Sequence, residues 1–146
     1  MIVLKTNSEI KQMKEACKIA AGALKAAGEA VEPGISTARV NKIANDFIVK
    51  HGAYPTFLGY NGYPAASCIS INDEIIHGIP DKNRIIQAGD IVSIDVGATF
   101  KGYVGDNAAT FAAGEISPEA QRLCDTTRES LYKGIEAAVA GGRLGD

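Results

Sequence analysis

Apolar residues recur at helical spacing along the first fifty positions of the chain. The spacing of Thr6 and Glu9 is typical of a capping box at the start of a helix. After them, apolar positions follow at alternating steps of three and four, and this stripe stops at Glu32-Pro33-Gly34: Ile10, Met13, Cys17, Ala20, Leu24, Ala27 and Val31. A second helix is predicted from Ser36 or Thr37 to about His51, with its own apolar face: Val40, Ile43, Ala44, Phe47 and Ile48.

The middle of the chain has strand-like rather than helical patterning. Segment 67–71 is a short strand candidate followed by the turn formers Asn72-Asp73. Segment 91–97 alternates, with Val92, Ile94 and Val96 on one face, and 103–111 returns as a third strand after a turn at Lys101-Gly102. The segment 53–64, dense in Gly, Pro and Tyr, is predicted to be an ordered loop.

A third helix is predicted near the end of the chain. Ser117-Pro118-Glu119 supplies a cap, a proline in the first turn and an acidic residue. Its stripe runs to the break at Gly141-Gly142: Ala120, Cys124, Thr127, Leu131, Ile135 and Ala138. Asp146 follows a Gly-rich stretch, which is a signal for the start of another helix. The elements together predict an α/β (α+β) fold in which antiparallel strands pack with long helices.

Composition narrows the functional class. The chain has 146 residues, 46% of them apolar, which is enough for one domain with an ordinary core. With 15 basic and 17 acidic residues scattered along it, the chain has no nucleic-acid footprint. No apolar run is long enough for a membrane span or a signal peptide, and the three cysteines have no CxxC spacing. We therefore expect a cytoplasmic protein without membrane or direct nucleic-acid partners.

Two acidic residues in the predicted hairpin indicate specific chemistry. If Lys101-Gly102 is a two-residue loop, Asp95 lies opposite Ala108 and Asp106 opposite Gly97, so both carboxylates project from one face. Such diagonal neighbours are about 7–8 Å apart, and one or two divalent cations between them would offset their repulsion. Two alternatives remain open: a solvated pair of surface carboxylates, and a turn shifted by one residue, which would place the two on opposite faces. Two ligands are also fewer than a catalytic metal site usually has.

Four blocks occur in order along the chain: LGYNGYP (58–64), CISINDEIIHGIP (68–80), GDIVSIDVGA (89–98) and GYVGDNAATF (102–111). They resemble the successive blocks of type I methionine aminopeptidases, with Asp95 and Asp106 at the spacing that the family has. The resemblance runs the whole length of the chain. It implies residues 1–146 as the N-terminal half of a single pita-bread catalytic domain. The whole domain would remove the initiator methionine from new polypeptides near the ribosome.

The resemblance also implies residue roles. Two divalent metal ions (Co, Mn, Fe or Zn) would be held in part by Asp95, which chelates one, and Asp106, which bridges both. His77 would hydrogen-bond the substrate near the scissile amide and stabilise the transition state. The metals would activate a water molecule for attack and hold the free amine of the substrate. The methionine pocket and its substrate contacts would come from an aromatic-rich set: Phe57, Tyr60, Asn61, Tyr63, Cys68 and His77.

The sequence departs from the family pattern in two places. Many bacterial members have His where Asn61 stands, so the contact made there differs. The remaining ligands of the family, one His and two Glu, belong to a second half that this sequence does not contain. We therefore expect the chain alone to be inactive, to bind metal weakly, and to expose an apolar face through which two copies could associate.

Two other functional classes compete with this interpretation. A non-catalytic pita-bread-like protein would use the fold to bind peptides or proteins, but such relatives usually lose the metal aspartates, and both are present here. A prolidase would usually carry a large domain before the catalytic fold, whereas the predicted elements begin within the first ten residues.

Overall fold

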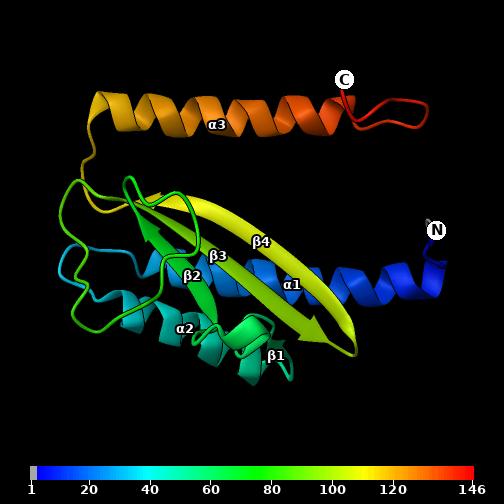
Figure 1. The fold of residues 1–146 in the computed structure, drawn as a ribbon, viewed down its shortest axis with the longest axis horizontal. Coiled ribbons are helices and arrows are strands. Elements are labelled where there is room, and N and C mark those ends of the chain that lie inside the picture. The colour runs from blue at the N-terminus through cyan, green and yellow to red at the C-terminus, as the bar shows by residue number, and fades with distance from the viewer. Residues whose placement is uncertain (1–2) are drawn as a thin grey trace. The chain divides into compact units, whose positions relative to one another are not determined.

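The structure is a computed structural model that describes residues 3–146 (Figure 1). The elements, in chain order, are the helices α1 (Asn7–Glu29) and α2 (Thr37–Lys50), β1 (Tyr54–Pro55), the 3₁₀ turn η1 (Tyr60–Gly62), β2 (Ser67–Ile71), β3 (Ile91–Phe100), β4 (Tyr103–Ala112) and α3 (Pro118–Ala137). They form two compact units, Met1–Glu115 and Ile116–Asp146, which are described separately below. The three predicted helices and the three predicted strands are all present.

Local side-chain caps define where the first two helices begin. Thr6 and Glu9 form the predicted capping box: the Thr6 hydroxyl accepts a hydrogen bond from Glu9 N, and the Glu9 carboxylate accepts one from Thr6 N at 2.7 Å. Ser36 caps α2 by accepting from Arg39 N. His51 ends α2, stacked on Phe47 with its ring nitrogen 2.8 Å from the Phe47 carbonyl oxygen. The second helix therefore ends where the sequence predicts, at about His51.

The buried face of α1 differs from the predicted stripe. Cys17 is exposed rather than buried, and the buried residues are mostly small: Ala16, Ala20, Ala23, Leu24, Ala27 and Gly28. The reason is a close approach of β4, because a Cβ at Gly105 would lie 2.4 Å from Cys17 N and 2.5 Å from the Ala16 carbonyl carbon. Alanines allow that contact and larger side chains do not, so the helix turns its alanine face inward.

The sheet is antiparallel and built around β3. β4 pairs along one side of β3, while β2 and the short β1 pair along the other: Ser67 is opposite Val96, and Tyr54 is opposite Thr99. β3 extends to Phe100, beyond the predicted end at Gly97, because Ala98 to Phe100 continue to pair with β4. β1 lies inside the segment predicted as a loop, since two residues are too few to show strand alternation.

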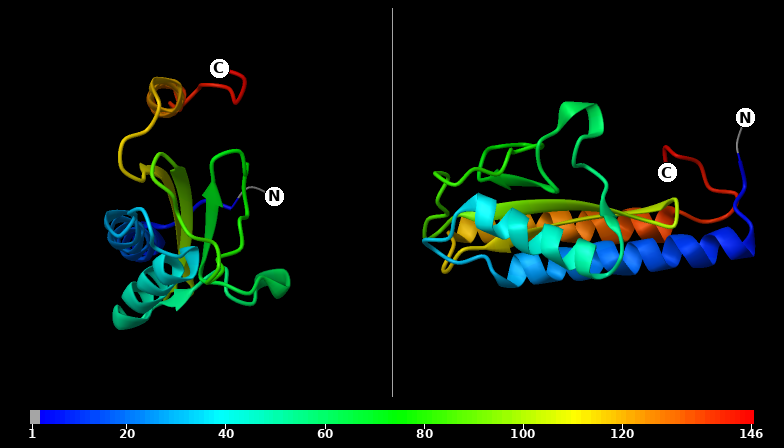
Figure 2. Two further views of the ribbon diagram at one scale, coloured as in Figure 1. Left: turned by 90° about the vertical axis from the view of Figure 1, so that its left-hand side faces the viewer. Right: turned by 90° about the horizontal axis from the view of Figure 1, so that it is seen from below.

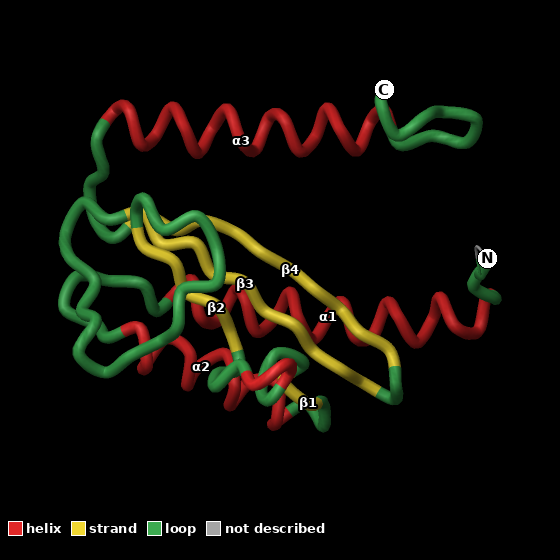
Figure 3. Tube along the Cα trace, viewed as in Figure 1, coloured by secondary structure: helices red, strands yellow, loops and turns green. Residues whose placement is uncertain are grey.

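The core lies between the sheet and two helices. In the first unit α1 packs on β3 and β4, and α2 packs on β1 and β2. Val92, Ile94 and Val96, the predicted inner face of β3, are fully buried in this layer. Figure 2 shows α1 and α2 on one side of the sheet, and Figure 3 shows that much of the chain between α2 and β3 is loop. The opposite face of the sheet is therefore left to these loops.

The second unit contains the single long helix α3. It begins as predicted, with the Ser117 hydroxyl accepting a hydrogen bond from Ala120 N. It ends at Ala137, before the predicted glycine stop, and Ala138 is its C-cap. No residue of α3, which lies wholly within the described part of the chain, is buried, and Cys124 is only partly covered. Within residues 3–146 no helix is both long and apolar enough to cross a membrane.

Candidate metal and peptide-binding site

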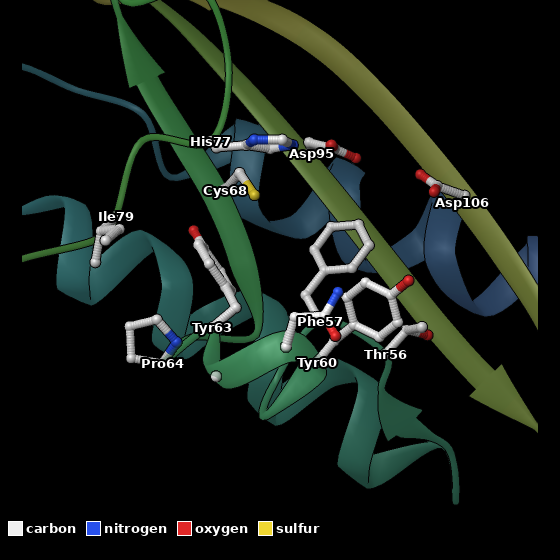
Figure 4. Close-up of a pocket in the computed structure, with 12 residues that line it drawn as sticks. Thr56, Phe57, Tyr60, Tyr63, Pro64, Cys68, His77, Ile79, Asp95 and Asp106 are labelled. Atoms are coloured by element: carbon white, nitrogen blue, oxygen red, sulfur yellow. The ribbon is translucent and has the colours of Figure 1, made fainter.

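The hairpin places the two carboxylates as the sequence predicts. Lys101 and Gly102 form the turn, both with positive φ, and Phe100 pairs with Tyr103. Asp95 is therefore opposite Ala108, and Asp106 is opposite Gly97. Figure 4 shows the two carboxylates on adjacent strands, directed toward each other. The predicted same-face arrangement is confirmed.

Asp95 is the more buried of the two aspartates. Its Oδ1 atom is buried and forms no hydrogen bond with any described residue. Burial, followed by the negative charge of Asp106, raises the pKa of Asp95 to about 6, although the nearby His77 and the Val96 backbone act in the opposite direction. Two carboxylates that face each other in this way are destabilised when both are ionised.

A divalent cation fits this pair of side chains. Hard cations bind carboxylate oxygens, and the buried Asp95 Oδ1 lacks the partner that a buried oxygen normally has. A cation near Asp106 would also offset the repulsion that raises the pKa of Asp95. Residues 3–146 contain no cluster of three or more His, Cys, Asp or Glu side chains that could hold a metal. The chain thus offers two ligands rather than a complete site.

A pocket of about 780 Å³ opens beside the carboxylates, and most of its lining residues belong to loops between α2 and β3 (Figure 4). Every residue predicted for the site lines it: Phe57, Tyr60, Asn61, Tyr63, Cys68, His77, Asp95 and Asp106. Four further lining residues were not predicted: Thr56, Gly62, Pro64 and Ile79. Three of these adjoin predicted residues in the sequence, which is the signal that could have found them. Ile79 lies two residues after the predicted His77, in the same loop.

The Phe57 ring can pack beside the carboxylates because Gly97 on β3 has no side chain at the point of contact. A Cβ at Gly97 would lie 2.7 Å from a Phe57 ring carbon and 2.9 Å from Thr56 Cβ. Thr56 is held in turn by a 2.9 Å hydrogen bond between its hydroxyl and that of Thr99. Since Gly97 is the residue opposite Asp106, the aromatic wall of the pocket lies directly beside the carboxylate pair.

Tyr63 and Cys68 form an uncharged wall of the pocket. The Tyr63 hydroxyl donates to the carbonyl oxygens of Ser67 and Gly78, each at 3.1 Å. Burial, and then the adjacent Cys68, raise the pKa of Tyr63 above its usual range. Burial also raises the pKa of the Cys68 thiol, an effect that Tyr63 partly opposes and Asp95 reinforces. Both side chains are therefore neutral near pH 7, which suits an apolar ligand.

Asn61 and His77 both lie in loops with left-handed backbone. Asn61 has φ 48° within η1, and His77 has φ 62° in the loop after β2. Positive φ is uncommon for residues other than glycine, although Asn and His adopt it more often than most. Figure 4 places the His77 imidazole beside Asp95 and Cys68 at the edge of the pocket. A histidine held in this conformation at a pocket edge is consistent with a specific role.

Comparisons with known proteins agree with this geometry. The profile of the family described as "Metallopeptidase family M24" matches residues 11–146. The chain is 51% identical to a methionine aminopeptidase of Clostridium acetobutylicum, covering 100% of this chain and 58% of the relative. It is 46% identical to methionine aminopeptidase 1 of Bacillus subtilis, covering 99% and 58%. The chain therefore spans a little over half the length of these relatives.

Solved structures give the same result for the fold. The methionine aminopeptidase of Thermotoga maritima matches with a TM-score of 0.91 and 40% identity, over 95% of this chain and 55% of that one. The prolidase of Pyrococcus horikoshii matches with a TM-score of 0.77 and 26% identity, over 93% and 38%. The predicted pita-bread fold is confirmed, over about half of the solved methionine aminopeptidase chain. The chain belongs to metallopeptidase family M24, and its resemblance to methionine aminopeptidases over part of their length is confirmed.

Proposed function

We propose that this chain is the N-terminal half of a metal-dependent aminopeptidase that removes the initiator methionine from new polypeptides in the cytoplasm. The observation that carries the proposal is the pair Asp95 and Asp106, which face one pocket from adjacent strands while a buried Asp95 oxygen lacks a partner among the described residues. The similarity to methionine aminopeptidases favours this activity over that of a prolidase, because identity reaches 51% with the former and 26% with the Pyrococcus prolidase.

The residues of this chain would have distinct roles in binding metal and substrate. Asp95 and Asp106 would hold divalent cations, which supply Lewis acidity and lower the pKa of bound water. His77 would donate a hydrogen bond to the substrate near the scissile amide. The unbranched methionine side chain would pack in the pocket against Phe57 and Tyr60, among others. Tyr63, Cys68 and Asn61 complete its lining.

The neutral wall and the carboxylate pair would determine which peptides bind. A pocket with aromatic walls and neutral Tyr63 and Cys68 favours an apolar side chain and leaves charged ones without a partner. The free amine of an N-terminal residue could bind the cations held by the two carboxylates, which a peptide-bond nitrogen inside a chain could not. Both features together favour a peptide that begins with methionine.

A chimeric protein tests the proposal. This chain would be joined to the part of the Clostridium acetobutylicum methionine aminopeptidase that it does not cover. With Mn²⁺ or Co²⁺, the chimera should release methionine from Met-Gly-Met, lose activity in EDTA and regain it when metal is added. Asp106→Asn should abolish release, while Asp125→Asn, on the exposed surface of α3, should leave it unchanged.

The isolated chain serves as the comparison. Its two carboxylates should bind Mn²⁺ weakly by calorimetry, and it should release no methionine, because two ligands hold a cation poorly. A folded chimera that releases no methionine with any divalent metal would refute the proposed activity. Methionine release by the 146-residue chain alone would refute its assignment as half of a site.

A further inference from the structure

The loop that carries His77 is not held by apolar packing. Ile75 and Ile76, which precede it, are 93% and 59% exposed, and Ile79 after it is 52% exposed. His77 itself is exposed and has a positive φ of 62°, which is uncommon for residues other than glycine. The position of this imidazole must therefore depend on polar contacts on either side of it.

Gly78 fixes the backbone directly after His77. Its N–H donates to the Ser70 hydroxyl at 3.0 Å, and its carbonyl oxygen accepts from Ile69 N at 2.8 Å. A Cβ at Gly78 would lie 2.1 Å from the Ile69 carbonyl oxygen, so only glycine can approach β2 this closely. These contacts hold one point of the loop but do not tie its two arms together.

Arg84 joins the two arms of the loop to the strand. One guanidinium nitrogen donates to the Ile79 carbonyl oxygen at 2.7 Å and approaches the Ile69 carbonyl oxygen at 3.4 Å. The other donates to Glu74 Oε2, and the same oxygen accepts from Ile71 N at 2.8 Å. Glu74, three residues before His77, and Ile79, two residues after it, are thus both bound to the Arg84 guanidinium.

The backbone of Arg84 is also held in place. Its carbonyl oxygen accepts from Thr37 N at 2.9 Å, and Thr37 is fully buried at the start of α2. The side chains of Arg84 and Glu74 are 29% and 43% exposed. The other ion pairs of the described chain each join residues three or four apart in one helix. Their side chains are 49–76% exposed. The Arg84–Glu74 pair is the one that spans ten positions and restrains a loop.

We propose that Arg84 and Glu74 are positioning residues that hold His77 at the pocket. This rests on the proposed role of His77 in peptide hydrolysis. The planar guanidinium can donate to the Glu74 carboxylate and to two carbonyl oxygens in fixed directions at once. A lysine ammonium would keep the charge but not this fork, so Arg84→Lys separates geometry from charge.

Hydrogen exchange on the 146-residue chain tests the positioning directly. In Arg84→Lys and Arg84→Gln, exchange of the Gly78 amide, which donates to the Ser70 hydroxyl, should become roughly tenfold faster or more, with the glutamine variant the faster. Amides between β3 and β4 should keep their rates, which shows that the fold is intact. Arg128→Gln, which breaks an exposed pair on α3, is the matched control and should change neither set. Unchanged exchange at Gly78 in both Arg84 variants would refute the proposal.

A double-mutant cycle in the chimera tests whether the effect acts through His77. Arg84→Gln should lower kcat by roughly tenfold with little change in KM, and the same substitution in a His77→Ala background should have almost no further effect. A merely structural role would lower activity equally in both backgrounds, which would overturn the functional part. If the unsubstituted chimera is inactive, the proposed function fails, and the exchange rates still decide whether Arg84 positions the loop.

Discussion

The two long helices α1 and α3 begin alike but differ in what their apolar residues contact. Both follow a side-chain cap, Thr6 or Ser117, and both carry an apolar stripe over 23 and 20 residues. α1 buries six residues of mostly small size, whereas α3 buries none. Leu131 is 61% exposed and Ile135 57% exposed, so the apolar stripe predicted for α3 is exposed. Local signals determine a helix, but burial depends on a partner.

The largest contrast should come from shortening one apolar side chain in each unit. Ile94→Ala removes a fully buried side chain from the core of the first unit and should lower the free energy of unfolding by about 3–4 kcal/mol. Leu131→Ala removes an exposed side chain from α3 and should change it by less than about 0.5 kcal/mol. Urea unfolding followed by circular dichroism measures both. Equal losses would mean that Leu131 is buried in solution, for example between two copies of the chain.

A glycine substitution should change sign between the two units. Gly105→Ala places a Cβ 2.4 Å from the α1 backbone and should destabilise the chain by about 2–3 kcal/mol, because a helix must move to admit it. Gly134→Ala on α3 meets no atom within 4 Å of the new Cβ and should stabilise the helix by about 0.5–1 kcal/mol. Thermal unfolding curves compare the two. A neutral Gly105→Ala would contradict the close approach of β4 to α1.

The sequence predicted those parts of the site that depend on short-range geometry. A two-residue turn fixes the register of the hairpin, and with it the shared face of Asp95 and Asp106. The same reasoning failed for Cys17, because the rotation of α1 follows from the glycine that it meets on β4. Nor could it predict Ile79 in the pocket or Arg84 at the His77 loop. Both belong to irregular loops, where no periodic pattern marks which side chains face a pocket or bind a neighbouring loop.

The pH dependence of stability should differ between buried and exposed acids. The folded-state pKa of Asp95, about 6, lies above its unfolded value, so the folded chain binds this proton more tightly. This contribution to stability is present at acidic pH and is lost as the pH rises through about 6. Asp95→Asn should therefore stabilise the metal-free chain at pH 8 by about 1–2 kcal/mol after allowance for solvent screening, and by little at pH 4.

Urea unfolding in EDTA at both pH values checks this difference. Asp125→Asn is the matched substitution on α3, where the carboxylate is exposed, and it should change stability by less than about 0.5 kcal/mol at either pH. A Mn²⁺ concentration that saturates the aspartates should reverse the sign for Asp95→Asn, since a bound cation favours the ionised carboxylate. Equal stability of the Asp95→Asn and unsubstituted chains at pH 8 would contradict the cost of burying an ionised Asp95 beside Asp106.

The smallest effect should come from the helix caps, where the two units are most alike. Thr6→Ala and Ser117→Ala each remove the hydroxyl that accepts a backbone N–H, at Glu9 and Ala120 respectively, and each should cost about 1 kcal/mol of helix stability. Thr6→Ala should lower the unfolding free energy of the first unit, because α1 is part of its core. Ser117→Ala should instead reduce the helical signal of α3 and speed exchange of its first amides, with the β3–β4 amides unchanged. If Ser117→Ala lowered the protection of β3 and β4, α3 would have to be coupled to the core despite its exposed face.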